Sequence, residues 1–332
     1  MEFSSLKKRD DTFDIIKGVC ILLMVVGHTC LPMVPSRIIC SFHMPAFLIA
    51  AGYFAHKQSF KRIVSVGFRR LLIPYLIAYA ICLILCALLC PHVANTEILH
   101  SLLNVDNPIG CLAMMDGGTL PVWFLFALFW CRLVFNLILR VKNDAVKLVI
   151  CFAIPLLAVN IYTYGKWPFC LLIGLSALGF YSMGYFLNEL NFRESKKIWG
   201  YFPVLLMAWF VCLFSTEPLG VWRNVYNGFY ILDCLGALAI FLILYIVIEK
   251  GKSNNRMWNF LKWCGVNSLI ILCVHAIEFG LINYPFVKTL LTQYFLWYSV
   301  YVVILLRLIF DIALAFLLSK SFIVRKYIFA QE

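Results

Sequence analysis

Long apolar segments alternate with short polar connections from one end of the chain to the other. A helix needs about 20 mostly apolar residues to cross a bilayer. Ten segments approach this length: 13–32, 38–55, 71–90, 120–139, 146–163, 168–187, 198–214, 225–248, 266–284 and 295–319. The pattern predicts an all-α fold, a polytopic integral membrane helix bundle of about ten transmembrane helices that forms one domain over residues 1–332.

The composition excludes the common alternatives to such a bundle. Hydrophobic residues make up 63% of the 332-residue chain, charged residues make up only 13%, and the mean hydropathy is +0.91. Soluble domains are about half apolar and a quarter charged. Disordered chains have low hydrophobicity, and the strands of porin-type barrels are far less continuously apolar. The composition therefore also indicates a helical membrane protein.

The positive charges follow the predicted topology. The formal net charge is +12. Of the 28 Lys and Arg residues, 21 lie at the two termini, in the second, fourth, sixth and eighth connections, or, for Lys147, at the border of the fourth connection. Because basic connections remain in the cytoplasm, we expect both termini there, with the basic face against anionic membrane lipid. The charge excess then reflects topology, and nucleic acid is not an expected partner. The first apolar segment carries charged residues and no small-residue cleavage site follows it, which indicates a retained first span.

The first span carries an unusual row of polar residues. Asp14, Lys17 and His28 follow three- and four-residue steps along one face of the predicted helix. Lys17 and His28 are eleven residues apart, which is about 16 Å of rise and about three turns of a helix. Lys17 could instead snorkel beside Asp14, and His28 could be a packing histidine. Their common stripe favours a functional interpretation, since imidazole is the usual proton acceptor near neutral pH.

The second span brings another histidine to the same region. His43 lies near its outer start, and His28 lies near the outer end of the first span, so a tight connection places them at similar depth. Two histidines can hold a metal ion, but no clear carboxylate or thiolate companion accompanies this pair. We therefore expect no metal. Trp123, at the outer start of the fourth span, has a position typical of the aromatic belt.

The last two spans also contain ionisable residues, which are costly in a membrane and usually face the bundle interior. Arg307 and Asp311 are spaced i, i+4, and we expect them to form a neutralised structural pair. His275 and Glu278 are one turn apart on the preceding span. They are either a hydrogen-bonded packing pair or part of a cavity wall, and the spacing leaves both interpretations open.

Two connections are long enough to carry a function. Residues 91–119, predicted to be extracytoplasmic, contain no Lys or Arg and include the acidic residue Asp116. Cys90 and Cys111 flank or lie in this connection and could pair in an oxidising compartment.

The inner connection 56–70 is basic and ends in Arg69 and Arg70. It is either an interfacial segment against anionic lipid or a site for an anionic cytoplasmic ligand.

Several of these segments together resemble one protein family. The first span, with Lys17 followed by ten residues and then His28, resembles the opening helix of the membrane acyltransferase 3 family. Four further segments are similar to family segments in the same order: SFHMPAFLIAAGYF at 41–54, RRLLIPY at 69–75, VWFLFALF at 122–129 and GVNSLIILCVH at 265–275. Ala51 departs from the pattern, where a serine is common. The chain looks like the stand-alone members that resemble fucose 4-O-acetylase.

The resemblance implies transfer of an acyl group, usually acetyl from acetyl-CoA, to a hydroxyl of a glycan or lipid-linked sugar at the bacterial plasma membrane. On the donor side, we expect Lys17, Arg69 and Arg70 to bind the phosphates of acetyl-CoA. The expected catalytic residues are His28, Lys17 and Asp14, and His28 is expected to act as general base on the acceptor hydroxyl or to receive the acyl group transiently.

On the acceptor side, the expected sugar-binding residues are His43, Trp123, Asp116 and His275. The alternative function is a transporter or flippase of a glycan or lipid-linked precursor, because buried ionisable residues also mark transport paths. Transporters often show inverted repeats and paired broken helices, and the sequence shows neither clearly. A purely structural envelope subunit would not require the aligned Asp14, Lys17 and His28.

Overall fold

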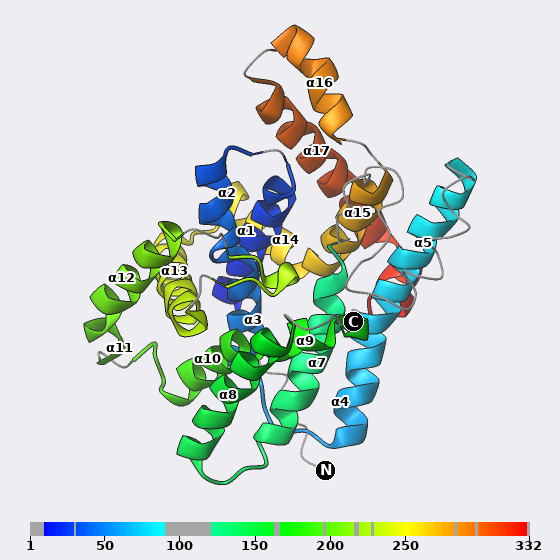
Figure 1. The fold of residues 1–332 in the computed structure, drawn as a ribbon. Coiled ribbons are helices and arrows are strands. Elements are labelled where there is room, and N and C mark those ends of the chain that lie inside the picture. Colours follow the sequence, from blue (N-terminus) through cyan, green and yellow to red (C-terminus); the bar gives the residue numbers. More distant parts are fainter. Residues whose placement is uncertain are drawn as a thin grey trace.

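The computed structural model describes residues 10–29, 31–89, 121–162, 167–194, 197–215, 219–226, 229–281, 284–295 and 298–330. Over these residues the chain forms helices joined by short connections (Figure 1), together with one isolated β-bridge between Gly220 and Val225. The all-α class expected from the sequence is therefore confirmed for the described part of the chain.

The helices are numbered in chain order. They are α1 (Asp11–Gly27), α2 (Met33–Cys40), α3 (His43–Tyr53), α4 (Phe60–Gly67), η1 (Phe68–Leu72), α5 (Ile73–Leu89), α7 (Trp123–Ile138), α8 (Asp144–Tyr162), η2 (Pro168–Cys170), α9 (Leu171–Ser176), α10 (Leu178–Glu189), α11 (Lys197–Gly200), α12 (Phe202–Leu213), η3 (Val221–Arg223), α13 (Tyr230–Gly251), α14 (Arg256–Val266), α15 (Ser268–Leu281), α16 (Tyr284–Phe295), α17 (Ser299–Lys320) and η5 (Val324–Ile328).

Six helical stretches in the described residues are long and apolar enough to cross a membrane: Met33–Tyr53, Phe60–Cys82, Asp144–Tyr162, Leu171–Glu189, Tyr230–Gly251 and Ser299–Lys320. The pair α14 and α15, bent by 73°, adds a seventh if it counts as one span. The remaining predicted segments contain the shorter helices α1, α7 and α12. The chain is thus a multi-pass helical protein, while the count of ten and the side of the termini stay predictions.

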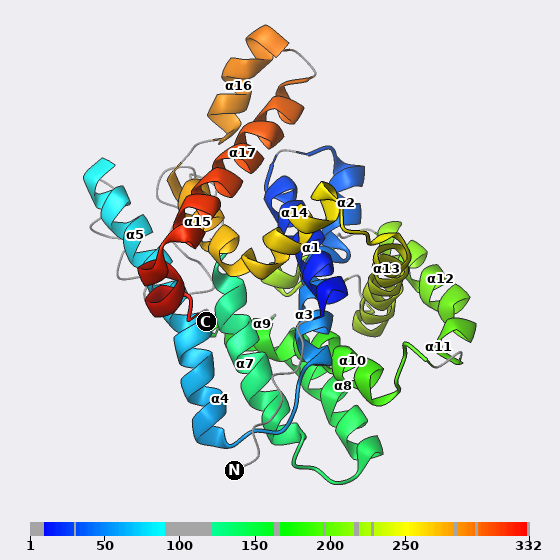
Figure 2. The same ribbon diagram turned by 180° about the vertical axis from the view of Figure 1, so that it is seen from behind.

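Helix α1 lies at the centre of the bundle. It packs against α14, α3, α13, α15 and α17, and Figures 1 and 2 show it among them in both views. Its crossing with α14 is close because both helices carry a glycine there. A Cβ on Gly18 would lie 1.9 Å from the Leu261 carbonyl oxygen, and a Cβ on Gly265 would lie 1.7 Å from the Asp14 carbonyl oxygen. Small residues allow this backbone approach, as is common between membrane helices.

The basic connection 56–70 is helical over most of its length. Ser59 caps α4 by accepting a hydrogen bond from the Arg62 amide, and α4 continues through the π-helical turn η1 into α5. Arg69 and Arg70 lie in η1. π-Helical turns occur frequently at functional sites.

The cysteines of the described residues are mostly buried. Ten cysteines in the described residues carry free thiols, and nine of these are buried. Burial agrees with their use as small apolar side chains. Residues 91–119, including Asp116, and the suggested partners Cys90 and Cys111 lie outside the described residues.

Candidate functional site

His28 lies at the end of α1, where its side chain turns back onto the helix. It is the C-terminal capping residue of α1, and its backbone N–H bonds the carbonyl oxygen of Met24. The ring Nδ1 also lies 2.9 Å from the same carbonyl oxygen. A carbonyl oxygen only accepts hydrogen bonds, so this contact favours the tautomer with the proton on Nδ1.

A second histidine connects His28 to a carboxylate. His275 of α15 is completely buried, with its Nδ1 2.8 Å from Asp311 Oδ2 and its Nε2 3.3 Å from His28 Nδ1. Ionised Asp311 accepts a hydrogen bond from the Nδ1–H of neutral His275. The Nε2 of His275 then carries no proton and accepts a hydrogen bond from His28 Nδ1–H. Both contacts of His28 then assign its proton to Nδ1. The Nε2 atom of His28 is left with a free lone pair, as a general base requires.

Arg307 holds the same cluster from α17. It is completely buried, and its Nε and Nη2 donate to the two oxygens of Glu278 at 3.1 and 3.0 Å. Its Nη1 donates to the backbone carbonyl of His28 at 2.6 Å. Arg307 therefore fixes the end of α1 from which His28 projects. Bidentate carboxylate pairing of this kind gives both strength and orientation.

The expected pairing of Arg307 with Asp311 along one helix is replaced by pairing across helices. Arg307 forms its bidentate contact with Glu278, and Asp311 accepts from His275. The i, i+4 spacing brings two side chains to one helix face, but the packing of α15 against α17 supplies partners with better geometry. His275 and Glu278 are also neighbours, with Nδ1 and Oε2 3.5 Å apart, and both are buried.

The cluster becomes electrically neutral when it takes up one proton. With both carboxylates ionised and both histidines neutral, Arg307, Glu278, Asp311, His28 and His275 carry one net negative charge. Protonation of His28 would make the cluster neutral. A buried arrangement of this kind stabilises an imidazolium that forms during a reaction, because its dipoles and charges are already in place.

Three residues of types that commonly bind metal ions also lie together in this cluster. His275, Glu278 and Asp311 offer ligand atoms that all lie within 4.8 Å of one another. Arg307 already occupies both oxygens of Glu278 and supplies positive charge at the same place. The three residues and Arg307 therefore form an ion-pair network. They are not the two residues, His28 and His43, that were considered as metal ligands from the sequence.

A small pocket opens beside His28. Its volume is about 90 Å³, and its lining includes His28, His43, Trp123 and Trp222. The structure thus brings together three side chains from α1, α3 and α7 that the sequence selected separately. His43 is buried, with its Nδ1 2.7 Å from the Ile39 carbonyl oxygen. Trp123 is 5% exposed, and so it lines the pocket from inside the bundle and does not form part of an aromatic belt.

Trp222 and the relay residue Asp311 were not identified as site residues from the sequence. Trp222 belongs to the short helix η3, between two apolar segments, where a tryptophan is typical of the membrane interface. Its position in the lining of the pocket, which depends on the fold, distinguishes Trp222 from an ordinary interfacial tryptophan. The ring of Trp222 lies under the guanidinium of Arg223, 4.3 Å from the ring centroid.

Lys17 is separate from the pocket that contains Arg69 and Arg70. Its ammonium pairs with Asp14 Oδ1 at 2.6 Å, and the side chain is 28% exposed while Asp14 is buried. Arg69 and Arg70 line a pocket of about 750 Å³, and Lys17 is not among the described residues of its lining. The three cations that the sequence assigned to one donor site thus differ in their surroundings, since Lys17 pairs with Asp14 on α1 while Arg69 and Arg70 line this pocket. Their shared role in donor binding stays a prediction.

The fold and these contacts define a multi-pass helical membrane protein with a buried histidine–carboxylate relay that ends at a pocket. A family model described as an acyltransferase domain matches residues 10–318. The chain therefore belongs to the membrane acyltransferase 3 family, as the sequence resemblance indicated.

One curated protein supports this membership over a shorter stretch. The chain is similar to the nodulation protein NolL of Sinorhizobium fredii (strain NBRC 101917 / NGR234), with 39% identity over 84 residues. The match covers 20% of this chain and 23% of that protein, so it spans less than a quarter of the relative's length. No solved structure matches the chain.

Proposed function

We propose that this membrane acyltransferase is an O-acetyltransferase of the bacterial plasma membrane. It moves an acetyl group from acetyl-CoA on the cytoplasmic side to a hydroxyl of a cell-surface glycan or lipid-linked sugar. The observation that carries the proposal is the Asp311, His275 and His28 relay, which leaves the Nε2 of His28 as a free base beside a pocket. Family membership supplies the reaction class.

In the proposed step, His28 Nε2 accepts the proton of the acceptor hydroxyl while the hydroxyl oxygen bonds to the thioester carbonyl carbon. The carbon–sulfur bond then breaks, and the departing thiolate takes the proton back from His28. The products are an ester and the free thiol of CoA. His275 and Asp311 act as positioning residues, because they hold the His28 tautomer and offset the charge of its imidazolium.

The side chains that line this pocket of about 90 Å³ suit contact with the reacting, hydroxyl-bearing part of the acceptor. Trp123 and Trp222 offer aromatic surface, and His43 offers a ring nitrogen for hydrogen bonding. On the donor side, Arg69 and Arg70 offer the positive charge that phosphates need. The Lys17 and Asp14 pair lies in the first half of α1, away from His28, and we propose that Lys17 contacts a donor phosphate in place of Asp14.

The proposal is tested by the transfer of labelled acetyl from acetyl-CoA into the glycan and lipid-linked sugar fractions of membranes. We expect His28→Ala to reduce transfer by about 10²-fold or more, since general base catalysis contributes this much. His56→Ala is the matched control, because His56 is exposed and its Nδ1 contacts the nearby Phe54 carbonyl. Undiminished transfer by the His28 variant would refute the catalytic role. Glycan export by the wild type without binding of acetyl-CoA would favour the transporter alternative.

A further inference from the structure

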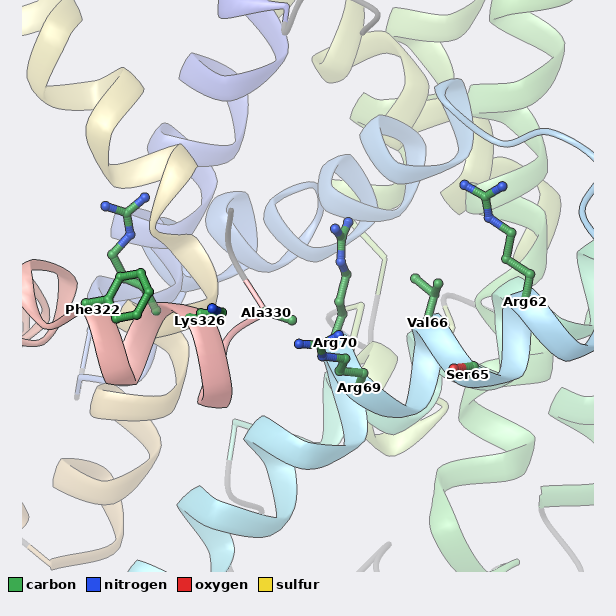
Figure 3. Close-up of a pocket in the computed structure, with 9 residues that line it drawn as sticks. Arg62, Ser65, Val66, Arg69, Arg70, Phe322, Lys326 and Ala330 are labelled. Carbon is green, nitrogen blue, oxygen red and sulfur yellow. The ribbon is translucent and has the colours of Figure 1, made fainter. Parts of the chain in front are cut away.

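Two segments far apart in the sequence form opposite walls of the basic pocket. One wall comes from α4 and η1, with Arg62, Arg69 and Arg70, and the other from the segment after α17, with Arg325 and Lys326. Figure 3 shows Arg69 extending toward the segment that carries Lys326 and Ala330. The sequence placed all five cations on the predicted cytoplasmic face, and the structure assembles them around one cavity.

The second wall is held in place by the bundle. The π-helical turn η5 (Val324–Ile328) packs against α17 and α5. Phe329, directly after it, is 6% exposed and belongs to the main hydrophobic core, and its amide bonds the Val324 carbonyl. Arg325 and Lys326 therefore lie on a segment that is packed against α17 and α5.

The described lining of the pocket contains several cations and no carboxylate. Its nine described lining residues comprise four arginines and one lysine but no Asp or Glu. Among the described residues, Arg62, Arg69 and Arg70 have no carboxylate partner within ion-pair distance. Like charges held together repel one another, and an anion that bridges the two walls would remove that cost.

The lining also includes an aromatic ring. Phe322 is 68% exposed, and the ammonium of Lys326 lies 5.1 Å from its ring centroid. Clustered arginines fit phosphate oxygens, and an exposed ring fits the face of a nucleobase. The volume of about 750 Å³ lies within the usual range of small-ligand pockets.

We propose that the C-terminal segment forms half of the donor-binding site, with Arg325 and Lys326 binding phosphate groups of a phosphorylated nucleotide opposite Arg69 and Arg70. This inference rests on the proposed function, because the nucleotide in question is the CoA part of the acyl donor. The clustered phosphates of a nucleotide and the headgroups of anionic lipids share this chemistry. The volume of the pocket, which suits a small ligand, and the aromatic ring favour the nucleotide.

The test measures the Kd of coenzyme A for the full-length protein in phosphatidylcholine nanodiscs. We expect Arg325→Ala with Lys326→Ala to weaken binding about tenfold, the effect of losing about 1.4 kcal/mol of charge-assisted contacts. The matched control is Arg140→Ala with Lys142→Ala, which removes the same charge from an exposed connection outside the pocket. It should change the Kd less than about twofold, as expected for exposed charges that solvent and salt screen. The charge-conserving pair Arg325→Lys with Lys326→Arg should retain binding and shows that loss of fold is not the cause.

Two results would overturn the inference. One is an equal Kd for the tail pair and the control pair. The other is an unchanged Kd for coenzyme A together with weaker association with phosphatidylglycerol vesicles, which would assign the cations to lipid. If His28→Ala abolishes transfer while the tail pair binds coenzyme A normally, this inference fails and the proposed function stands. A wild type that binds no coenzyme A refutes both the donor assignment and this inference.

Discussion

Arg307 connects three parts of the molecule at one buried point. Its guanidinium contacts both oxygens of Glu278 on α15 and the carbonyl of His28 at the end of α1, and it lies 5.4 Å from the Phe279 ring centroid. A buried ion pair is weak evidence for stability as such, but loss of one partner leaves the other charge without compensation. Arg307 therefore links the integrity of the fold to the position of the proposed base.

This dependence gives a prediction at the residue scale. We expect Arg307→Met to destabilise the protein by about 3–5 kcal/mol, because the buried Glu278 charge loses its partner. The double variant with Glu278→Gln should recover part of this loss, since it removes the charge left behind. Melting temperatures in one detergent check both variants. A double variant no more stable than the additive sum of the singles would contradict the pairing.

The residues selected from the sequence were those that a single helix makes recognisable. His28 and Lys17 share a stripe on α1, and His43 was placed at the same depth, which agrees with the pocket that His28 and His43 now line. The partners of His275 and Arg307 could not be found in this way. Spacing reveals neighbours along one helix, whereas Asp311 and Glu278 meet these residues across the contact of α15 with α17.

At the scale of elements, the close crossing of α1 and α14 positions the relay. Gly18 and Gly265 allow the two backbones to touch, and Asn267 follows at the sharp bend into α15. The bend of 73° directs α15, and with it His275, against the end of α1. The apolar pattern predicted a span over 266–284, but it contained no information about this angle.

We expect Gly265→Ala to weaken this crossing. The added methyl group would lie 1.7 Å from the Asp14 carbonyl oxygen, so one of the two backbones must move. Overpacking of this kind costs about 1–3 kcal/mol. Gly200→Ala in α11 is the control, because no atom lies within 4 Å of the added methyl group. An unchanged melting temperature for Gly265→Ala would show that the crossing is looser than described.

In the molecule as a whole, the proposed donor site and the proposed acceptor site lie in two different pockets. The basic pocket lies between η1 and η5, whereas the pocket beside His28 is lined by residues of α1, α3, α7 and η3. The positive-charge pattern predicts that the basic pocket faces the cytoplasm. Direct transfer at His28 would then require the acyl-bearing arm of the donor to extend from the basic pocket to the pocket beside His28.

The topology itself is open to measurement. We expect epitope tags at both termini to be accessible to antibody in inverted membrane vesicles and protected in right-side-out vesicles, since both ends are rich in Lys and Arg. A tag in 91–119 should show the opposite pattern. Opposite accessibility of the two termini would require an odd number of spans and would contradict the predicted arrangement.

In the proposed acyl transfer, Asp311 and His275 act through His28. The most direct measurement is the initial rate of labelled acetyl transfer from acetyl-CoA for the wild type, His28→Ala, Asp311→Asn and the double variant, at matched membrane abundance. Residues that work as one unit lose activity non-additively. We expect Asp311→Asn to lower kcat with little change in the KM for acetyl-CoA, and the double variant to be no slower than His28→Ala alone. A wild-type rate in His28→Ala, or a double variant slower by the product of the two single effects, would contradict it.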